Sequence, residues 1–398
     1  MPDYVTTFEI YIGRGVRHLT DEMGQAADAM VHDDVAEISL MLAKRKQALH
    51  LLNYALKLPK LWEDTRRLLL ILAPMIERTG EYEEWIPFLL WGIEQSETLA
   101  DEDTTAPLKL HLGLLYEIQT DYDQAKHYLT TSAQQFARLN RPVDQAKALN
   151  HLAHVARLER QFEQAQQYLQ QAQQLLAVDD DEWVYNTMVQ GLVAYDTHQW
   201  LEAGHCFGVC QDRWSRAGDL RMLAWTLTNL GATLRQLQKF YQAIAIYEFS
   251  FDILAQYHDP LNQAVAQMNL GNIYLEQDKL SLALQQYEAA EPVFRQRNDQ
   301  LRQAQIYNNI GYTYYLLQEW DKAENFYALS LPNFVDAGAI ASEINVLDGL
   351  GLVYVGQGKL DQAKAMFEQA LTKLSQIEQD PVHAQLQAAI KQNLAKVV

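Results

Sequence analysis

Apolar and small residues recur along this chain at a fixed interval. The stretch from Met268 to Tyr274 is followed by Ala283, Tyr287 and Ala290, and nearly the same arrangement returns 40 residues later and 40 residues earlier. The chain shows no strand-like alternation of apolar and polar residues. A period of this size without such alternation is typical of an array of helical repeats.

Four positions of each repeat carry side chains of restricted size. A small residue stands where the two helices of a repeat are expected to pack, at Gly113, Ala153, Gly191, Gly231, Gly271, Gly311 and Gly351. Twelve residues after each comes an alanine, at Ala125, Ala165, Ala203, Ala243, Ala283, Ala323 and Ala363. A bulky residue follows four positions later (Leu129, Leu169, Phe207, Tyr247, Tyr287, Tyr327, Phe367), and a small one three beyond that (Ser132, Ala172, Cys210, Ser250, Ala290, Ser330, Ala370). Helices approach closely only where side chains are small, so a large residue there would cost about 1–3 kcal/mol.

This pattern resembles the tetratricopeptide repeat, in which two antiparallel helices pack through small residues near their crossing point. The usual period of that family is about 34 residues, whereas the spacing here is 40, or 38 between Ala153 and Gly191. Long repeats of this kind resemble those of the kinesin light chain, the LGN adaptor, bacterial quorum-peptide receptors and the sensor arrays of STAND regulators. The resemblance implies an all-α fold, a right-handed superhelix of helix-turn-helix repeats.

The repeats divide the chain into three predicted parts. Residues 1–102 are predicted to be helical but irregular. They contain a repeat that is degenerate, because Trp85 stands where a small residue belongs. This repeat is expected to cap the array, since terminal repeats depart from the pattern. Residues 103–379 hold seven repeats, and residues 380–398 form a capping helix opened by Asp380 and Pro381. We expect one continuous body.

The N-terminal part is expected to contain four helices. Phe8 to Leu19 lie in the first, Asp33 and Asp34 cap the second, the third spans 62–78, and the fourth spans 81–99. Prolines at 74 and 87 are expected to kink or shorten the last two.

Prolines also punctuate the repeats. Pro142 and Pro260 are placed to begin a helix, whereas Pro292 and Pro332 are expected to kink the second helix of their repeats or end it early. The acidic run 179–182 at the 38-residue spacing is expected to be a solvated connector at a helix start.

Composition narrows the classes of ligand. The formal net charge of -19 disfavours binding to nucleic acid or to an anionic membrane. Cys206 and Cys210 are the only cysteines, so no disulfide framework supports the fold and a reducing compartment is expected. No secretory signal or long apolar run is apparent, and we expect a cytoplasmic protein.

A row of amides is the strongest candidate for a binding site. The position two before the small packing residue is Asn229, Asn269 and Asn309, with His111 and His151 in earlier repeats, while Val189 and Gly349 break the row. It resembles the asparagine ladder of the kinesin light chain and LGN families, whose amides hold the backbone of an extended peptide. An amide both donates and accepts hydrogen bonds, as a peptide backbone requires. The alternative is that these amides tie neighbouring helices together.

The same helical face is expected to present further candidates, namely Arg157, Tyr195, Trp225, Arg235, Asn272, Asn308, Tyr312 and Tyr315. Aromatic residues and arginines are frequent at binding hot spots. The two arginines are expected to receive a carboxylate from a ligand. For the aromatic side chains, packing between repeats is an equal alternative.

A search for catalytic chemistry returns little. The chain lacks a phosphate-binding loop, a His-Glu-x-x-His zinc motif and a Gly-x-Ser-x-Gly nucleophile motif. His151 with His154, and His205 with the two cysteines, are weak metal-site candidates, and we predict no metal or cofactor. The sequence therefore favours a non-catalytic scaffold or sensor that binds a protein or peptide in a concave groove. The alternatives are a peptide-responsive regulator similar to quorum-peptide receptors, and the sensor subunit of a STAND-type signalling system with a separate effector.

Overall fold

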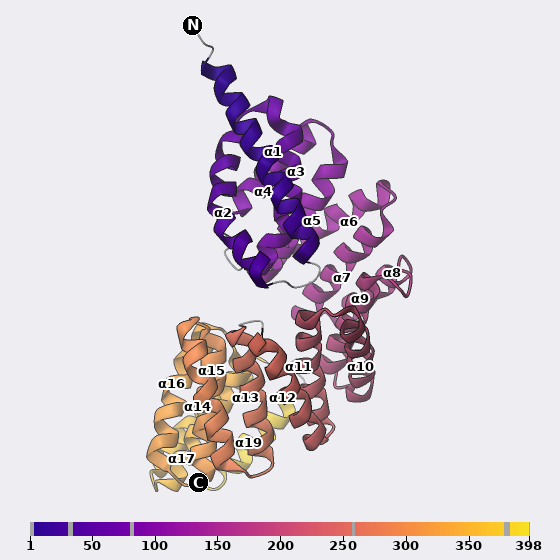
Figure 1. Ribbon diagram of the computed structural model, residues 1–398. Helices are drawn as coiled ribbons and strands as arrows, with labels where there is room; N and C mark the ends of the chain where they lie inside the picture. The colour runs from indigo at the N-terminus through magenta and orange to yellow at the C-terminus, as the bar shows by residue number, and fades with distance from the viewer. Residues whose placement is uncertain (1–3, 31–34, 80–82, 257–258, 378–382, 398) are drawn as a thin grey trace. The chain divides into compact units, whose positions relative to one another are not determined.

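The computed structural model describes residues 4–30, 35–79, 83–256, 259–377 and 383–397, and within these ranges the chain is all-α (Figure 1). The helices before the regular repeats are α1 (Tyr4–Met30), α2 (Val35–Ala55), a 3-10 turn at Pro59–Leu61, α3 (Trp62–Thr79) and α4 (Ile86–Thr98). The helices that follow are α5 (Glu102–Ile118), α6 (Tyr122–Arg138), α7 (Pro142–Leu158), α8 (Phe162–Gln173), α9 (Asp181–Asp196), α10 (Trp200–Ala217), α11 (Leu220–Gln236), α12 (Phe240–Gln256), α13 (Pro260–Glu276), α14 (Leu280–Gln296), α15 (Gln300–Leu316), α16 (Trp320–Asp336), α17 (Ile340–Gly356), α18 (Leu360–Leu374) and α19 (His383–Leu394). The predicted all-α repeat class is confirmed.

The chain forms two compact units, Met1–Thr233 (unit 1) and Leu234–Val398 (unit 2). The single continuous body predicted from the sequence stays a prediction. The boundaries at residues 102 and 379 and the right-handed course of the whole array stay predictions.

In five repeats, those of Gly113, Gly191, Gly271, Gly311 and Gly351, the bulky residue 16 positions later packs directly on the small residue. A Cβ added to Gly271 would lie 2.4 Å from Cε1 of Tyr287, and one added to Gly351 would lie 2.4 Å from Cε1 of Phe367. The alanine between them, Ala283 or Ala363, is fully buried. The rings therefore lie directly on the backbone of the first helix, which is why the sequence keeps this position small.

In three repeats the last small residue carries a donor that joins its helix to the first helix by a hydrogen bond. The hydroxyls of Ser132 and Ser330 donate to the carbonyls of Ala106 and Ala304 at 2.8 and 2.7 Å. The thiol of Cys210 donates to the carbonyl of Val184 at 3.4 Å. In each case the acceptor lies 26 residues earlier. A serine or cysteine at this position is therefore small enough for the helix crossing and also supplies a hydrogen-bond donor to it.

The turns between helices share one backbone device. Twelve of the described turns contain a residue in the left-handed region, for example Thr120 (φ 62°), Asp278 (φ 59°) and Gly358 (φ 75°). The following amide closes the turn on the carbonyl five residues back, as when the N–H of Lys279 donates to Tyr274 at 2.8 Å. Two successive helices thus meet through the same joint throughout much of the chain.

The described joint between α8 and α9 departs from this pattern. Helix α8 has 12 residues, whereas α6 and α7 have 17, and residues 174–180 connect it to α9. Asp179 is exposed, as expected of a solvated connector. The prediction of a solvated connector is wrong for Glu182. Its carboxylate points inward and accepts a hydrogen bond from Asn150 Nδ2 at 2.6 Å. Burial raises the pKa of Glu182.

The irregular helices build a core of their own. Leu19, Leu52, Leu68 and Leu89 are almost completely buried in one cluster, and Trp85 is 2% exposed against it. Helix α4 begins at Ile86 rather than at 81, with Pro87 in its first turn, where a missing N–H costs little. The predicted caps at residues 33–34 and 380–381 lie outside the described residues.

The predicted early ends of two helices are wrong, whereas a kink at their prolines stays a prediction. Pro292 and Pro332 lie inside α14 and α16, and each helix keeps 17 residues. Two positions after each proline stands a buried phenylalanine, Phe294 or Phe334. Burial of these rings holds the last turn in place despite the lost N–H donor, since tertiary packing supplies most helix stability.

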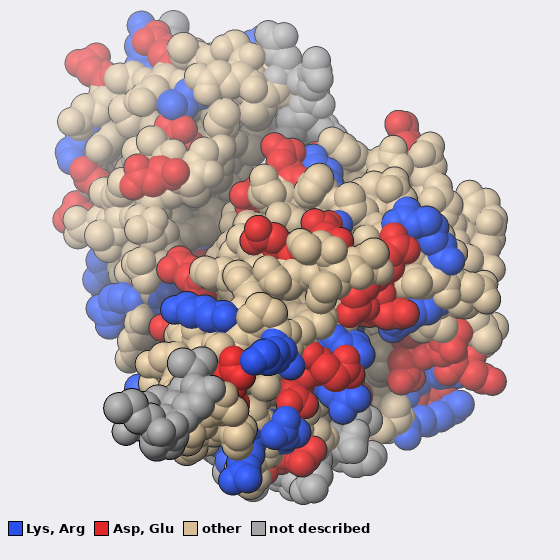
Figure 2. Space-filling model, turned by 90° about the horizontal axis from the view of Figure 1, so that it is seen from above, with Lys and Arg blue, Asp and Glu red and all other residues tan. Residues whose placement is uncertain are grey.

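The surface is mixed in charge. In the view of Figure 2 acidic and basic side chains are interspersed among a majority of other residues. Among the described residues, each helix is too short or too polar to cross a membrane. The surface in this view lacks the single-sign field that would mark a strongly basic partner site.

Candidate functional site

Unit 2 contains a pocket built mostly from amide side chains. It has a volume of about 170 Å³ and lies among the first helices of three repeats, α13, α15 and α17, with one residue from α16. Its lining residues are Met268, Asn272, Gln305, Asn308, Asn309, Phe334, Ser342 and Asn345. Three of the predicted site residues, Asn272, Asn308 and Asn309, are thus brought together.

Hydrogen bonds within the protein use some of the amide groups of this pocket and leave others available to a ligand. Asn309 Nδ2 donates to Asn272 Oδ1 at 2.9 Å, and the Tyr287 hydroxyl donates to the same oxygen at 2.8 Å. Among the described residues Asn272 Nδ2 has no acceptor, so its hydrogens can donate to a ligand. Asn308 Nδ2 makes a long bond of 3.4 Å to Asn309 Oδ1 and keeps its own oxygen as an acceptor.

The three asparagines of the predicted row differ in their hydrogen bonds. Asn269 is partly exposed, does not line the pocket, and makes no hydrogen bond with a described side chain. Asn309 ties α15 to α13, which is the structural alternative for this position. In unit 1, Asn229 donates to the carbonyl of Trp225 at 2.9 Å, within its own helix. A ligand-holding role for the row stays a prediction.

Sequence reasoning missed five lining residues, the apolar Met268 and Phe334 and the polar Gln305, Ser342 and Asn345. Gln305 and Asn345 each stand six positions before the small packing residue of their repeat, at Gly311 and Gly351. The same 40-residue spacing that exposed the asparagine row would have found this second row of amides.

Two tyrosines lie on α15 beyond the pocket. Tyr312, 41% exposed, stacks on Tyr315 with ring centroids 6.1 Å apart and planes inclined by 16°. Tyr315 in turn contacts Trp320 at 5.7 Å. Tyr315 is thus held by packing against its neighbours, which was the alternative to ligand contact. Tyr312 is more exposed, and its ring can contact a ligand.

In unit 1 the corresponding positions hold a cluster of charged groups. The Nδ1 atoms of His151 and His154 both donate to the carboxylate of Glu117, at 2.9 Å for His151. His154 Nε2 lies 3.3 Å from Arg157 Nη2 and accepts its hydrogen bond when the imidazole is neutral, since a guanidinium has only donors. Burial would raise the pKa of Glu117, but the charges and hydrogen bonds of His151 and His154 outweigh it and hold the pKa at about 2.

Both candidate arginines already have a carboxylate of this chain as a partner. Arg157 pairs with Asp196 at 2.9 Å, and Arg235, in unit 2, pairs with Glu276 at 2.8 Å. The expected role of receiving a carboxylate from a ligand would require each arginine to exchange its partner.

The remaining candidates in unit 1 are packed against neighbours. The ring of Tyr195 lies 5.1 Å from that of Trp200, and the ring of Trp225 lies 6.3 Å from that of Tyr185. His111 is 8% exposed. These side chains contribute contacts between helices.

The cysteine pair is unsuited to metal binding. Cys206 and Cys210 are both buried, and burial raises their pKa values to about 11 and about 12. A metal requires the thiolate, so the protonated thiols are poor ligands. Within the part of the chain that the structure describes, no three His, Cys, Asp or Glu side chains are grouped to hold a metal ion.

Comparison with known proteins supports the helical-repeat reading. Tetratricopeptide-repeat family models match residues 222–296 and 301–376, and another matches residues 146–175. A search of curated proteins gives no match.

Several solved structures share the fold. A STAND protein with a tetratricopeptide repeat sensor from Pyrococcus horikoshii has a TM-score of 0.64 and 14% identity, covering 89% of this chain and 54% of its own. A Rap protein complexed with competence and sporulation factor has a TM-score of 0.57 and 14% identity, covering 84% and 99%. NprR in complex with its cognate peptide NprX has a TM-score of 0.53 and 14% identity, covering 71% and 81%. At these identities the likeness concerns the fold. Together with the seating of rings on small residues, the matches identify this chain as one that carries tetratricopeptide repeats, at residues 146–175, 222–296 and 301–376.

Proposed function

We propose that this chain is a non-catalytic binding module that holds an extended peptide or protein segment on the first helices of unit 2. The observation that carries the proposal is the amide pocket of α13, α15 and α17, whose hydrogen-bonding capacity is only partly used. Among the proteins of similar fold, NprR is described in complex with its cognate peptide NprX, and the Rap protein in complex with competence and sporulation factor.

The chemistry of the pocket suits a peptide backbone. Asn272 Nδ2 can donate, Asn308 Oδ1 can accept, and Gln305 and Asn345 make no hydrogen bond with described residues and can do both. An extended main chain carries alternating donors and acceptors that must be matched when water is removed. A lining of carboxamides meets this demand without regard to the side chains of the ligand.

The size of the pocket limits what one pocket can hold. Its 170 Å³ correspond to about six water molecules at roughly 30 Å³ each. Affinity for a longer segment therefore needs further contacts along the same helices, and Asn269 and Tyr312 are the proposed contributors. Cytoplasmic signalling, and action through a separate effector, remain the proposed setting.

Selection from a display library of short random peptides tests this function. Peptides that bind the wild type are measured by fluorescence anisotropy against the double variant Gln305→Ala with Asn345→Ala, which removes two open amides. We expect affinity to fall by roughly tenfold or more, since each lost hydrogen bond contributes about 0.5–1.5 kcal/mol.

Gln285→Ala is the matched control, because Gln285 is an exposed amide on α14 outside the pocket. Unchanged affinity in the double variant, or a selection that yields no binder for the wild type, would contradict the proposal.

A further inference from the structure

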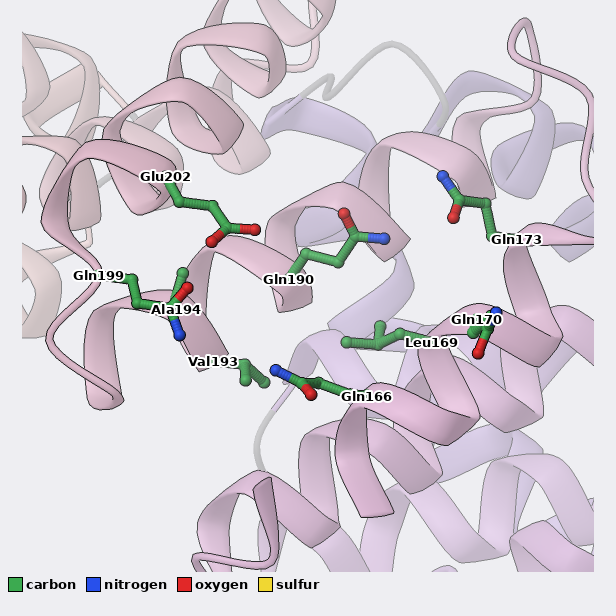
Figure 3. A pocket seen from close by; sticks show the side chains of 9 residues that line it. All are labelled: Gln166, Leu169, Gln170, Gln173, Gln190, Val193, Ala194, Gln199 and Glu202. Atoms are coloured by element: carbon green, nitrogen blue, oxygen red, sulfur yellow. The ribbon is translucent and has the colours of Figure 1, made fainter. Parts of the chain in front are cut away.

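Unit 1 contains a second pocket, on other helices and of different chemistry. It has a volume of about 210 Å³ and lies between α8, α9 and α10, beside the short helix α8 (Figure 3). Its lining residues are Gln166, Leu169, Gln170, Gln173, Gln190, Val193, Ala194, Gln199 and Glu202. Five carboxamides and one carboxylate thus surround a small apolar floor.

A buried relay of hydrogen bonds sets the orientation of Gln190. Asn186 Nδ2 donates to the backbone carbonyl of Leu169 at 3.1 Å, and a carbonyl can only accept. The other side-chain atom of Asn186, Oδ1, must therefore accept, and it takes a bond of 2.8 Å from Gln190 Nε2. Gln190 consequently turns its own oxygen away from Asn186.

The far end of the relay agrees with this assignment. Asn186 Nδ2 also donates to Asn150 Oδ1 at 2.6 Å. Asn150 then presents Nδ2 to two acceptors, the backbone carbonyl and the carboxylate of Glu182, at 3.3 and 2.6 Å. Asn150 and Asn186 are both fully buried, so neither can exchange these bonds for water.

One side of the pocket therefore presents hydrogen-bond acceptors, from Gln190 and Glu202. Gln190 Oε1 makes no hydrogen bond with a described residue. Figure 3 shows Glu202 extending from α10 toward Gln190 of α9, with the amide oxygen of Gln190 on the side that faces Glu202. The Glu202 carboxylate forms no ion pair with a described residue, and no Lys, Arg or His is among the described residues that line the pocket.

We infer that this pocket binds an organic cation, an ammonium or guanidinium group. Such a group has several donors and no acceptor, which matches the Glu202 carboxylate and the Gln190 oxygen. The rotatable amides Gln166, Gln170 and Gln199 can turn their oxygens toward the remaining donors. The cation can belong to a lysine or arginine side chain of a partner or to a small free amine. This inference does not rest on the pocket of unit 2.

Titration with matched probes tests the inference. The probes are capped arginine and capped citrulline, which has a neutral urea in place of the guanidinium, and binding is followed by ligand-observed NMR. We expect capped arginine to bind the wild type roughly tenfold more tightly than capped citrulline. Raising the salt concentration should weaken only the binding of arginine.

Three variants locate the contact. Glu202→Gln should weaken capped arginine roughly tenfold and leave capped citrulline unchanged. Gln190→Met removes the acceptor at nearly constant size and should weaken arginine by a smaller factor. Glu163→Gln, an exposed carboxylate on α8 outside the pocket, should have no effect.

The source of the cation follows from a second titration, in which a short peptide bearing one arginine is compared with capped arginine and with agmatine. A peptide that binds more tightly than both, with the same loss in Glu202→Gln, assigns the site to a partner side chain. Equal binding of agmatine assigns it to a free amine. The inference is overturned if arginine and citrulline bind alike, if none of the probes binds, or if Glu202→Gln has no effect.

Discussion

The first helices of the two units carry polar residues at equivalent repeat positions, with opposite results. In unit 1, His151, His154 and Arg157 stand two before, one after and four after the small residue Ala153. Both histidines bind Glu117, and Arg157 binds His154 and Asp196. In unit 2, Asn269 and Asn272 stand two before and one after Gly271, and they leave donors and acceptors open. One scaffold thus supports a closed polar cluster and an open one.

The difference follows from the chemistry of the side chains. Charged groups in a partly buried setting must find partners, because an unpaired buried charge is costly. An amide has two donor hydrogens and a two-lone-pair acceptor, so it can make one structural bond and still offer others. Amide-rich first helices are therefore better suited to a ligand than charged ones.

The largest effect is expected when the closed cluster is opened. Glu117→Gln removes a carboxylate whose pKa is held at about 2 in the folded protein, against an ordinary value of 4.5. A lowered pKa stabilises the folded state fully above about pH 5, and the stabilisation is lost as the pH falls toward 2. We expect a loss on the order of 3 kcal/mol at pH 7 that shrinks below pH 5. Hydrogen exchange of the α5 and α7 amides, measured at several pH values, checks this.

Glu182→Gln is the control of opposite sign. Burial raises the pKa of Glu182, so its ionised form weakens the folded state above the ordinary pKa. The variant keeps an acceptor for Asn150 and should be neutral or slightly stabilising at pH 7. A loss as large as that of Glu117→Gln would show that any buried carboxylate here behaves alike.

The scaffold beneath the two regions should respond equally in both units. Ala165→Leu in unit 1 and Ala283→Leu in unit 2 each place bulk at a fully buried helix crossing. We expect each to destabilise its own unit by about 1–3 kcal/mol. Urea unfolding followed by exchange within each unit measures the two losses, and a marked inequality would mean that the repeats do not share one packing scheme.

A smaller effect separates the two asparagines of unit 2. Asn309→Ala removes the bond to Asn272 and should cost about 1 kcal/mol, because that bond joins α15 to α13. Unfolding of unit 2 in urea gives the value. If stability is unchanged, the structural role of Asn309 is contradicted, and its amide counts among those available to a ligand.

The smallest change in stability is expected at Asn269. Asn269→Ala breaks no hydrogen bond with a described residue, and its effect on unfolding should stay within about 0.5 kcal/mol. A peptide selected on the wild type should nevertheless bind less tightly. Destabilisation with unchanged peptide affinity would reverse the assignment.

The sequence predicted the helix crossings well and the polar contacts poorly. Gly271, Ala283 and Tyr287 could be assigned because side-chain size at a close crossing is dictated locally by the period. Asn309 and Asn269 look alike in sequence, yet one bonds Asn272 and the other does not, because the outcome depends on the residue of the neighbouring helix. The pairing of Arg157 with Asp196 escaped prediction for the same reason.

The repeated turn has a consequence for how this chain can change in length. Left-handed residues stand at 278, 298, 318, 338 and 358, so every joint in this stretch has the same phase. Deleting residues 279–318 would bring Asp278 before Glu319 and recreate a joint of the existing kind. The number of helical pairs is therefore free to vary without redesign of any connection, and with it the length of the ligand that such a surface can span.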